Sequence, residues 1–149
     1  MQQRSSDGTR MERTGWRDES ISRRHRDWGF NCPAVDLDFL VVEYNLGKPV
    51  ALIEYKHFKA QKPNFKHATY RALRELGDIS GLPFMVAFYW PESWSFCVSP
   101  QNQIARDWFG EWEPLTEYDY VNRLYEMRQL VLDTNIKGKL LRVMPPHAA

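Results

Sequence analysis

Residues 35–56 read VDLDFLVVEYNLGKPVALIEYK and contain the pattern that decides the fold. Two runs rich in β-branched and aromatic residues, 35–44 and 49–55, are separated by a short turn that contains Gly47. Such runs around a glycine-containing turn predict a β-hairpin. The second run includes four consecutive apolar residues, 50–53, which is typical of a strand buried on both faces. We therefore expect its strand to lie in the centre of a sheet.

The segments around the hairpin predict an α/β domain with a mixed central β-sheet flanked by helices. We expect helices over residues 15–28, about 66–76 and 117–130, and strands over 82–90 and 94–98. In the first helix, Ile21, His25 and Trp28 have the spacing of one inward face. Gly77 and Gly81 are expected at the end of the second helix, and Thr116 is the predicted N-cap of the last.

Length and composition narrow the class of protein. The 149 residues fit one domain, predicted over residues 14–149 after a mobile basic tail at 1–13. The formal net charge of +1 gives no global signature of polyanion binding. The two cysteines lack the spacing of a zinc site or a disulfide framework. We expect no membrane span and a cytoplasmic location, because no apolar run is long enough and the cysteine usage is typical of a reducing compartment.

Four charged residues fall at matched positions of the hairpin. Asp36 and Asp38 are two residues apart on the first run, and Glu54 and Lys56 are two apart on the second. Because side chains alternate along a strand, each pair is expected to share a face. Antiparallel pairing then brings Asp38 opposite Glu54 or Lys56. We expect three carboxylates and one ammonium to meet at one end of the hairpin.

Carboxylates at close range repel one another, and a buried charge without a partner is costly. Mg²⁺ or Mn²⁺ would relieve the repulsion, since both prefer oxygen ligands. Asp38, Glu54 and the backbone carbonyl of Tyr55 are the predicted ligands, with Asp36 as a further ligand or as a group that orients water. Lys56 would activate water or stabilise charge on a phosphate. The alternative is a solvated edge strand with a Glu–Lys ion pair.

The series Asp36-Leu-Asp38, a hairpin and Glu54-Tyr55-Lys56 resembles the PD-(D/E)XK nuclease superfamily. The resemblance covers about residues 16–90 and implies a restriction-endonuclease-like core with the order αβββαβ. It implies a metal-dependent nuclease, with DNA favoured as the substrate. Either Asp38 or Asp36 fills the family's aspartate position, and Asp38 is preferred.

Further candidates lie on the two helices that flank the hairpin. The resemblance implies a metal-binding glutamate on the first helix, which Glu19 fits, and His25 is a second candidate there. The alternative for His25 is a satisfied core residue, which is the commoner role of a single histidine on an apolar helix face. Four arginines are candidates for nucleic-acid contacts or, alternatively, are solvated: Arg23, Arg24, Arg71 and Arg74.

Two functions of different kinds are consistent with these residues. The first is a Mg²⁺- or Mn²⁺-dependent nuclease that hydrolyses phosphodiester bonds, with a homodimer expected if both strands of a duplex are cut. The second is a catalytically inactive nucleic-acid-binding or assembly protein that retains the nuclease fold. The first predicts products that disappear in EDTA, and the second predicts binding that persists in EDTA and weakens with salt.

Overall fold

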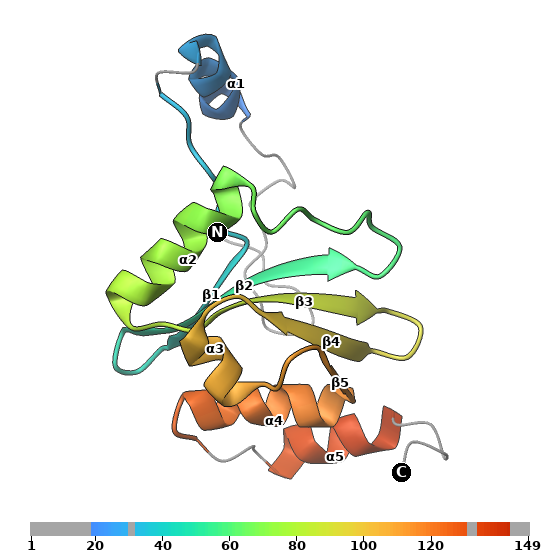
Figure 1. Ribbon diagram of the computed structural model, residues 1–149. Helices are drawn as coiled ribbons and strands as arrows, with labels where there is room; N and C mark the ends of the chain where they lie inside the picture. Colours follow the sequence, from blue (N-terminus) through green and yellow to red (C-terminus); the bar gives the residue numbers. More distant parts are fainter. Residues whose placement is uncertain (1–18, 30–31, 131–133, 144–149) are drawn as a thin grey trace, which may run out of the picture. The chain divides into compact units, whose positions relative to one another are not determined.

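The computed structural model describes residues 19–29, 32–130 and 134–143, which belong to two compact units divided between Asp36 and Leu37. In its described part, the first unit contains one helix, α1 (Ser20–Asp27). The second unit contains the sheet and the remaining helices (Figure 1). The predicted tail at residues 1–13 lies outside the described residues.

A five-stranded mixed sheet forms the centre of the second unit. Its strands, in spatial order, are β1 (Phe39–Glu43), β2 (Lys48–His57), β3 (Phe84–Trp90), β4 (Ser95–Pro100) and β5 (Glu113–Leu115). The β2–β3 pair is parallel and the other three pairs are antiparallel. The predicted hairpin and the predicted central position of the apolar strand are both confirmed, since β2 pairs with β1 and β3. Ala51, Leu52 and Ile53 of β2 are buried, as expected of a central strand.

Helices cover both faces of the sheet (Figure 1). On one face, Tyr70 and Leu73 of α2 (Ala68–Ser80) pack on the sheet in a core with Phe84 and Val86. The opposite core contains α3 (Gln103–Trp108) and α4 (Glu117–Met127), with Tyr120 among its largest buried side chains. The last helix, α5 (Thr134–Val143), lies beside α4. The α/β class with helices flanking a mixed sheet is therefore confirmed.

Several elements differ from the sequence prediction. The order αβββαβ has three strands between its first two helices, whereas the described chain has two. In α1 no residue is buried within its own described unit, and Ile21 and Trp28 are about half exposed, so the inward face of this helix stays a prediction. Among the described residues, no helix has both the length and the apolar character needed to cross a membrane.

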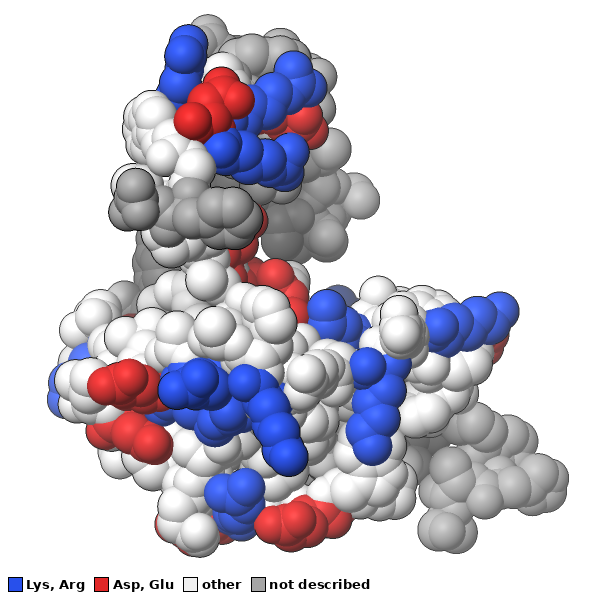
Figure 2. Space-filling view, turned by 45° about the horizontal axis from the view of Figure 1, so that its top comes forward, with Lys and Arg blue, Asp and Glu red and all other residues white. Residues whose placement is uncertain are grey.

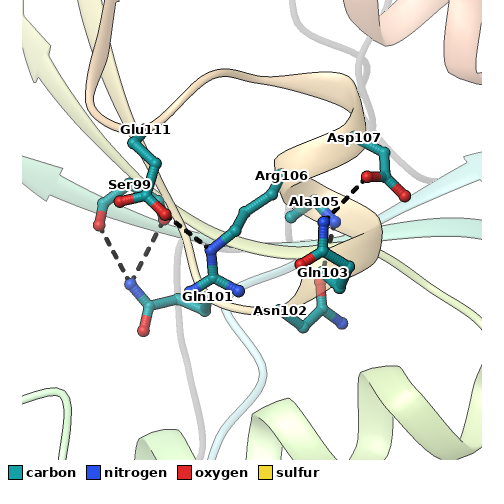
Figure 3. Close-up of polar contacts among 8 residues, drawn as sticks. All are labelled: Ser99, Gln101, Asn102, Gln103, Ala105, Arg106, Asp107 and Glu111. Atoms are coloured by element: carbon teal, nitrogen blue, oxygen red, sulfur yellow. Dashed lines mark hydrogen bonds and ion pairs between the residues drawn. The ribbon is translucent and has the colours of Figure 1, made fainter.

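Asn102 joins α2, α3 and the start of β3. Its side-chain oxygen accepts the N–H groups of Ala105 and Phe84, and its amide nitrogen donates to the carbonyl of Leu82 at 2.8 Å. Figure 3 shows Asn102 at the start of α3, next to Gln101, which donates to Ser99. Gly77 lies inside α2, not at its end: an added Cβ would lie 2.8 Å from the Asn102 amide nitrogen. Of the two predicted glycines, Gly81 ends the helix, and its φ of 70° is the left-handed conformation that glycine favours.

Candidate active site

Glu54 and Lys56 lie in the second half of β2, on the face that α2 covers. Their register partners on β3 are Val86 and Phe88, both buried in the core beneath α2. The Lys56 ammonium lies 3.2 Å from Oε1 of Glu54, and their side chains are 33% and 17% exposed. The Glu–Lys pair of the alternative interpretation is present, but β2 is an internal strand and not an edge.

Asp38 lies on the same face as Glu54. The pairing of β1 with β2 begins with Phe39 opposite Ile53, so one further step along the register brings Asp38 opposite Glu54. The ring of Phe39 packs against Tyr55 on the other face, with centroids 5.0 Å apart, which is consistent with this alternation. The predicted meeting of Asp38, Glu54 and Lys56 is therefore supported by the register.

Tyr70 of α2 adds a hydroxyl that the sequence analysis did not include. The residue is buried over the sheet. Burial, the negative charge of Glu54 and, to a smaller extent, the charge of Asp38 raise the pKa of Tyr70 to about 12. The hydroxyl is therefore protonated at neutral pH, and it can donate a hydrogen bond but cannot act as a base.

The second oxygen of Glu54 is the clearest sign of an incomplete site. Oε2 is buried and has no hydrogen-bond partner in the described part of the chain. A buried carboxylate oxygen normally accepts a hydrogen bond or binds a cation, because leaving it unpaired costs several kcal/mol or so. The nearby charge of Asp38 adds repulsion between the two carboxylates. A divalent cation would pair with the Glu54 oxygen and relieve this repulsion.

The backbone of β2 offers a third oxygen ligand. The N–H groups of Leu52 and Phe58 donate toward β3, to Pro83 and Tyr89, so the even-numbered residues of β2 direct their backbone groups to that side. The odd-numbered residues, including Tyr55, direct theirs toward β1. Pairing with β1 ends opposite Ile53, and the carbonyl of Tyr55 therefore lies beyond the paired part of β1.

Asp36, Glu19 and His25 belong to the first unit. The predicted start of the first strand at residue 35 is wrong, since β1 begins at Phe39. Asp36 and Asp38 therefore both precede the strand, and strand alternation does not place them on one face. Asp36 and His25 line one cleft of about 590 Å³ within the first unit. Glu19 forms an exposed ion pair with Arg23 at 3.2 Å. Their predicted roles at the metal stay predictions.

The structure brings together fewer candidate metal ligands than the sequence predicted. Among the residues that the structure describes, no group of three or more Asp, Glu, His and Cys is arranged to hold a metal. The expected convergence of three carboxylates is thus not observed there, and Asp38 and Glu54 remain with the carbonyl of Tyr55. Mg²⁺ is commonly bound by one or two carboxylates, with water and substrate phosphate completing its octahedron, so these residues fit the ion.

The predicted arginines have different surroundings. Arg23 and Arg24 are exposed on α1, and Arg71 is exposed on α2. Arg74 instead donates to the side chain of Gln101 at 3.1 Å, so it has a structural role. A stronger signal was missed: residues 55–74 contain four lysines and two arginines but no Asp or Glu. That segment begins at the candidate site and continues into α2.

No family model matches the chain, and searches of curated proteins and of solved structures find no match.

Proposed function

We propose that the chain is a Mg²⁺- or Mn²⁺-dependent nuclease that hydrolyses phosphodiester bonds at the face formed by Asp38, Glu54 and Lys56. The observation that carries this proposal is the Glu54 carboxylate: one oxygen pairs with Lys56, and the other is buried without a hydrogen-bond partner in the described part of the chain. The resemblance to PD-(D/E)XK nucleases, stated from the same residues, agrees with it, and DNA is the favoured substrate.

A bound divalent ion would supply charge neutralisation at the phosphate and lower the pKa of water. Asp38, Glu54 and the carbonyl of Tyr55 would hold that ion. Lys56 is already placed beside Glu54 and would stabilise negative charge that develops on the phosphate oxygens. Tyr70 stays protonated at neutral pH, because the charges of Glu54 and Asp38 oppose its ionisation, and it would act at this face as a neutral hydroxyl.

The test is cleavage of plasmid DNA, single-stranded DNA and RNA by the purified chain with Mg²⁺, with Mn²⁺ and with EDTA. Asp38→Asn and Lys56→Ala should each lower the rate by at least about a hundredfold, because each removes a group that stabilises the transition state. Lys48→Ala is the matched control, since Lys48 is an exposed lysine at the opposite end of the same strand. Lys48→Ala should cleave at the wild-type rate.

Cleavage that survives both substitutions, or that continues unchanged in EDTA, would overturn the proposal. Binding that persists in EDTA without any product in Mg²⁺ or Mn²⁺ would favour the alternative, a catalytically inactive nucleic-acid-binding protein. The basic segment 55–74 is compatible with that alternative too, because phosphate contacts do not require catalysis.

A further inference from the structure

The face that carries Glu54 and Lys56 continues into aromatic side chains that the proposed reaction does not use. Lys56 pairs in register with Phe88, and the ring of Trp112 lies 5.2 Å from that of Phe88. Near the end of β2, Phe58 stacks on Trp90, with centroids 5.4 Å apart and planes inclined by 17°. We call Phe58, Trp90 and Trp112 the aromatic surface; Phe88, which Trp112 contacts, is itself buried.

Trp112 is the accessible member of this surface. It is 54% exposed, although it is large and apolar. Its φ of 51° lies in the left-handed region, where a bulky residue is strained by roughly 1–3 kcal/mol. The backbone therefore holds an indole ring at the surface at some cost to stability. Such a ring next to a phosphate-binding site is suited to stack on an unpaired base.

The segment between β2 and α2, which begins with Phe58, carries positive charge that complements a nucleic-acid strand. Lys59, Lys62 and Lys66 are exposed, and in the described chain none of them is joined to an acid in an ion pair. The ammonium of Lys59 lies 5.6 Å from the centre of the Phe58 ring. Figure 2 shows Lys and Arg side chains at several places on the sheet-containing unit. Unpaired lysines beside aromatic rings are the combination by which proteins bind single strands.

We infer that the aromatic surface and Lys59, Lys62 and Lys66 bind a single strand of nucleic acid and direct it to Glu54 and Lys56. The fate of the strand at those residues rests on the proposed function, whereas its binding does not. A duplex keeps its bases stacked and presents no base face to Trp112, while a single strand does. Phe88 lies one strand away from Lys56, or about 4.8 Å. The Trp112 ring lies a further 5.2 Å from the ring of Phe88. Trp112 is therefore on the order of 10 Å from Lys56, or roughly three nucleotides.

The first experiment measures binding of the full chain, in EDTA, to labelled oligonucleotides of one sequence by fluorescence anisotropy. The probes are single-stranded DNA, single-stranded RNA and duplex DNA. Both single strands should bind at least about tenfold more tightly than the duplex, because only they offer free bases. A difference between the two single strands identifies the sugar that the surface accepts. Equal binding of the duplex would overturn the inference.

The second experiment compares two tryptophans with similar exposure and similar backbone conformation. Trp112→Ala should weaken single-strand binding by about tenfold, while Trp112→Phe, which keeps a ring, should restore most of it. Trp94→Ala is the control: Trp94 is 44% exposed and has a φ of 49°, but it stacks on Tyr89, which packs with the opposite core. Equal loss in Trp94→Ala and Trp112→Ala would overturn the inference.

The third experiment separates specific phosphate contacts from general charge. The double variant Lys59→Gln with Lys62→Gln should reduce the slope of log K against log salt by about 1.4, since each contact to a single strand contributes about 0.7. The control pair, Lys137→Gln with Lys139→Gln, changes two exposed lysines on α5, and it should leave the slope unchanged. An equal change in both pairs would contradict the assignment.

The two proposals fail in different ways. Single-strand binding that depends on Trp112, without cleavage in any metal, would end the nuclease proposal and leave the binding surface intact. Metal-dependent cleavage with no loss of single-strand affinity in Trp112→Ala would end the inference of a binding surface and leave the nuclease proposal intact.

Discussion

At the scale of single residues, the carboxylate of Glu54 has one oxygen beside Lys56 and another that is buried without a partner among the described residues. Glu43 on the neighbouring strand differs in this respect, because its Oε2 accepts the N–H of Leu46 at 2.6 Å. Both side chains are shielded from water, but of the two only Glu54 has a buried oxygen without a hydrogen-bond partner among the described residues. The difference between these two glutamates identifies which of them is suited to bind a cation.

Millimolar Mg²⁺ should therefore raise the melting temperature of the chain. At ten times the dissociation constant, binding to the folded state adds about 1.4 kcal/mol, or roughly 3–6 °C for a unit of this size. Glu54→Gln should abolish this shift, because an amide is a poor ligand for Mg²⁺, while Glu43→Gln should retain it. Thermal unfolding with and without EDTA measures both. An unchanged shift in Glu54→Gln would exclude this carboxylate as a ligand.

A second prediction at the scale of single residues concerns the stability of a Gly77→Ala variant. In an exposed helix, Gly→Ala stabilises by about 1 kcal/mol. Here the new Cβ would lie 2.8 Å from the amide nitrogen of Asn102 and 2.9 Å from the carbonyl oxygen of Leu82. Overpacking and disturbance of the Asn102 hydrogen bonds outweigh the helix propensity, so Gly77→Ala should destabilise by roughly 1–3 kcal/mol. Urea unfolding measures this, and a gain in stability would show that the contact with α3 can relax.

At the scale of elements, β5 and α4 are joined by one ion pair. The two terminal nitrogens of the Arg123 guanidinium, Nη1 and Nη2, donate to Glu113 at 2.8 and 2.9 Å. Nη1 also donates to the backbone carbonyl of Trp108. The N–H of Gly110 donates to the same carboxylate. The hydrogen bonds from Arg123 hold the pKa of Glu113 below its usual value, although burial acts in the opposite direction. The pair thus attaches the three-residue β5 to a longer helix.

The pH dependence of stability follows from the direction of that shift. Because the pKa of Glu113 is lower in the folded state, its contribution is complete above the unfolded value of about 4.5 and is lost as the pH falls through the folded pKa. Glu113→Gln should lower the free energy of unfolding by about 1–2 kcal/mol at neutral pH, and the difference from wild type should shrink below about pH 4.5.

Chemical unfolding at several pH values measures that difference. Glu111→Gln is the control, because Glu111 is 82% exposed in its pair with Arg106 and should contribute little (Figure 3). A difference for Glu113→Gln that is the same at every pH would show that packing, and not charge, attaches β5.

Local pattern predicted the elements that are long and strongly apolar. β2 and β3 follow from their apolar runs, and α4 begins after the predicted cap, Thr116, which accepts the N–H of Asp119. The six-residue α3 and the three-residue β5 were not predicted. β5 is defined by pairing with β4, a tertiary contact, whereas α3 begins at a local N-cap, Asn102, that was not recognised in so short a helix. Alternation and hairpin register brought Asp38, Glu54 and Lys56 together, whereas Tyr70 depends on how α2 lies over the sheet, which no local spacing encodes.

At the scale of the whole molecule, the buried residues are concentrated in the second unit. Every buried residue that the structure identifies lies between Glu43 and Tyr120. Burial of apolar area is the main favourable term in folding, so most of the free energy of folding of the described residues belongs to residues 37–149. The candidate ligands Asp38 and Glu54 lie in this unit too, while Asp36, His25 and Glu19 do not.

A chain that begins at Leu37 should therefore unfold in one cooperative transition, with a denaturant midpoint close to that of the full chain. If Asp38, Glu54 and the carbonyl of Tyr55 suffice for the metal, the shortened chain should keep the stabilisation by Mg²⁺. Loss of that stabilisation in a chain that still unfolds cooperatively would show that a group in residues 1–36 completes the site. Asp36→Asn and His25→Ala in the full chain would then identify that group, because only the substitution of the actual ligand would abolish the Mg²⁺-dependent shift.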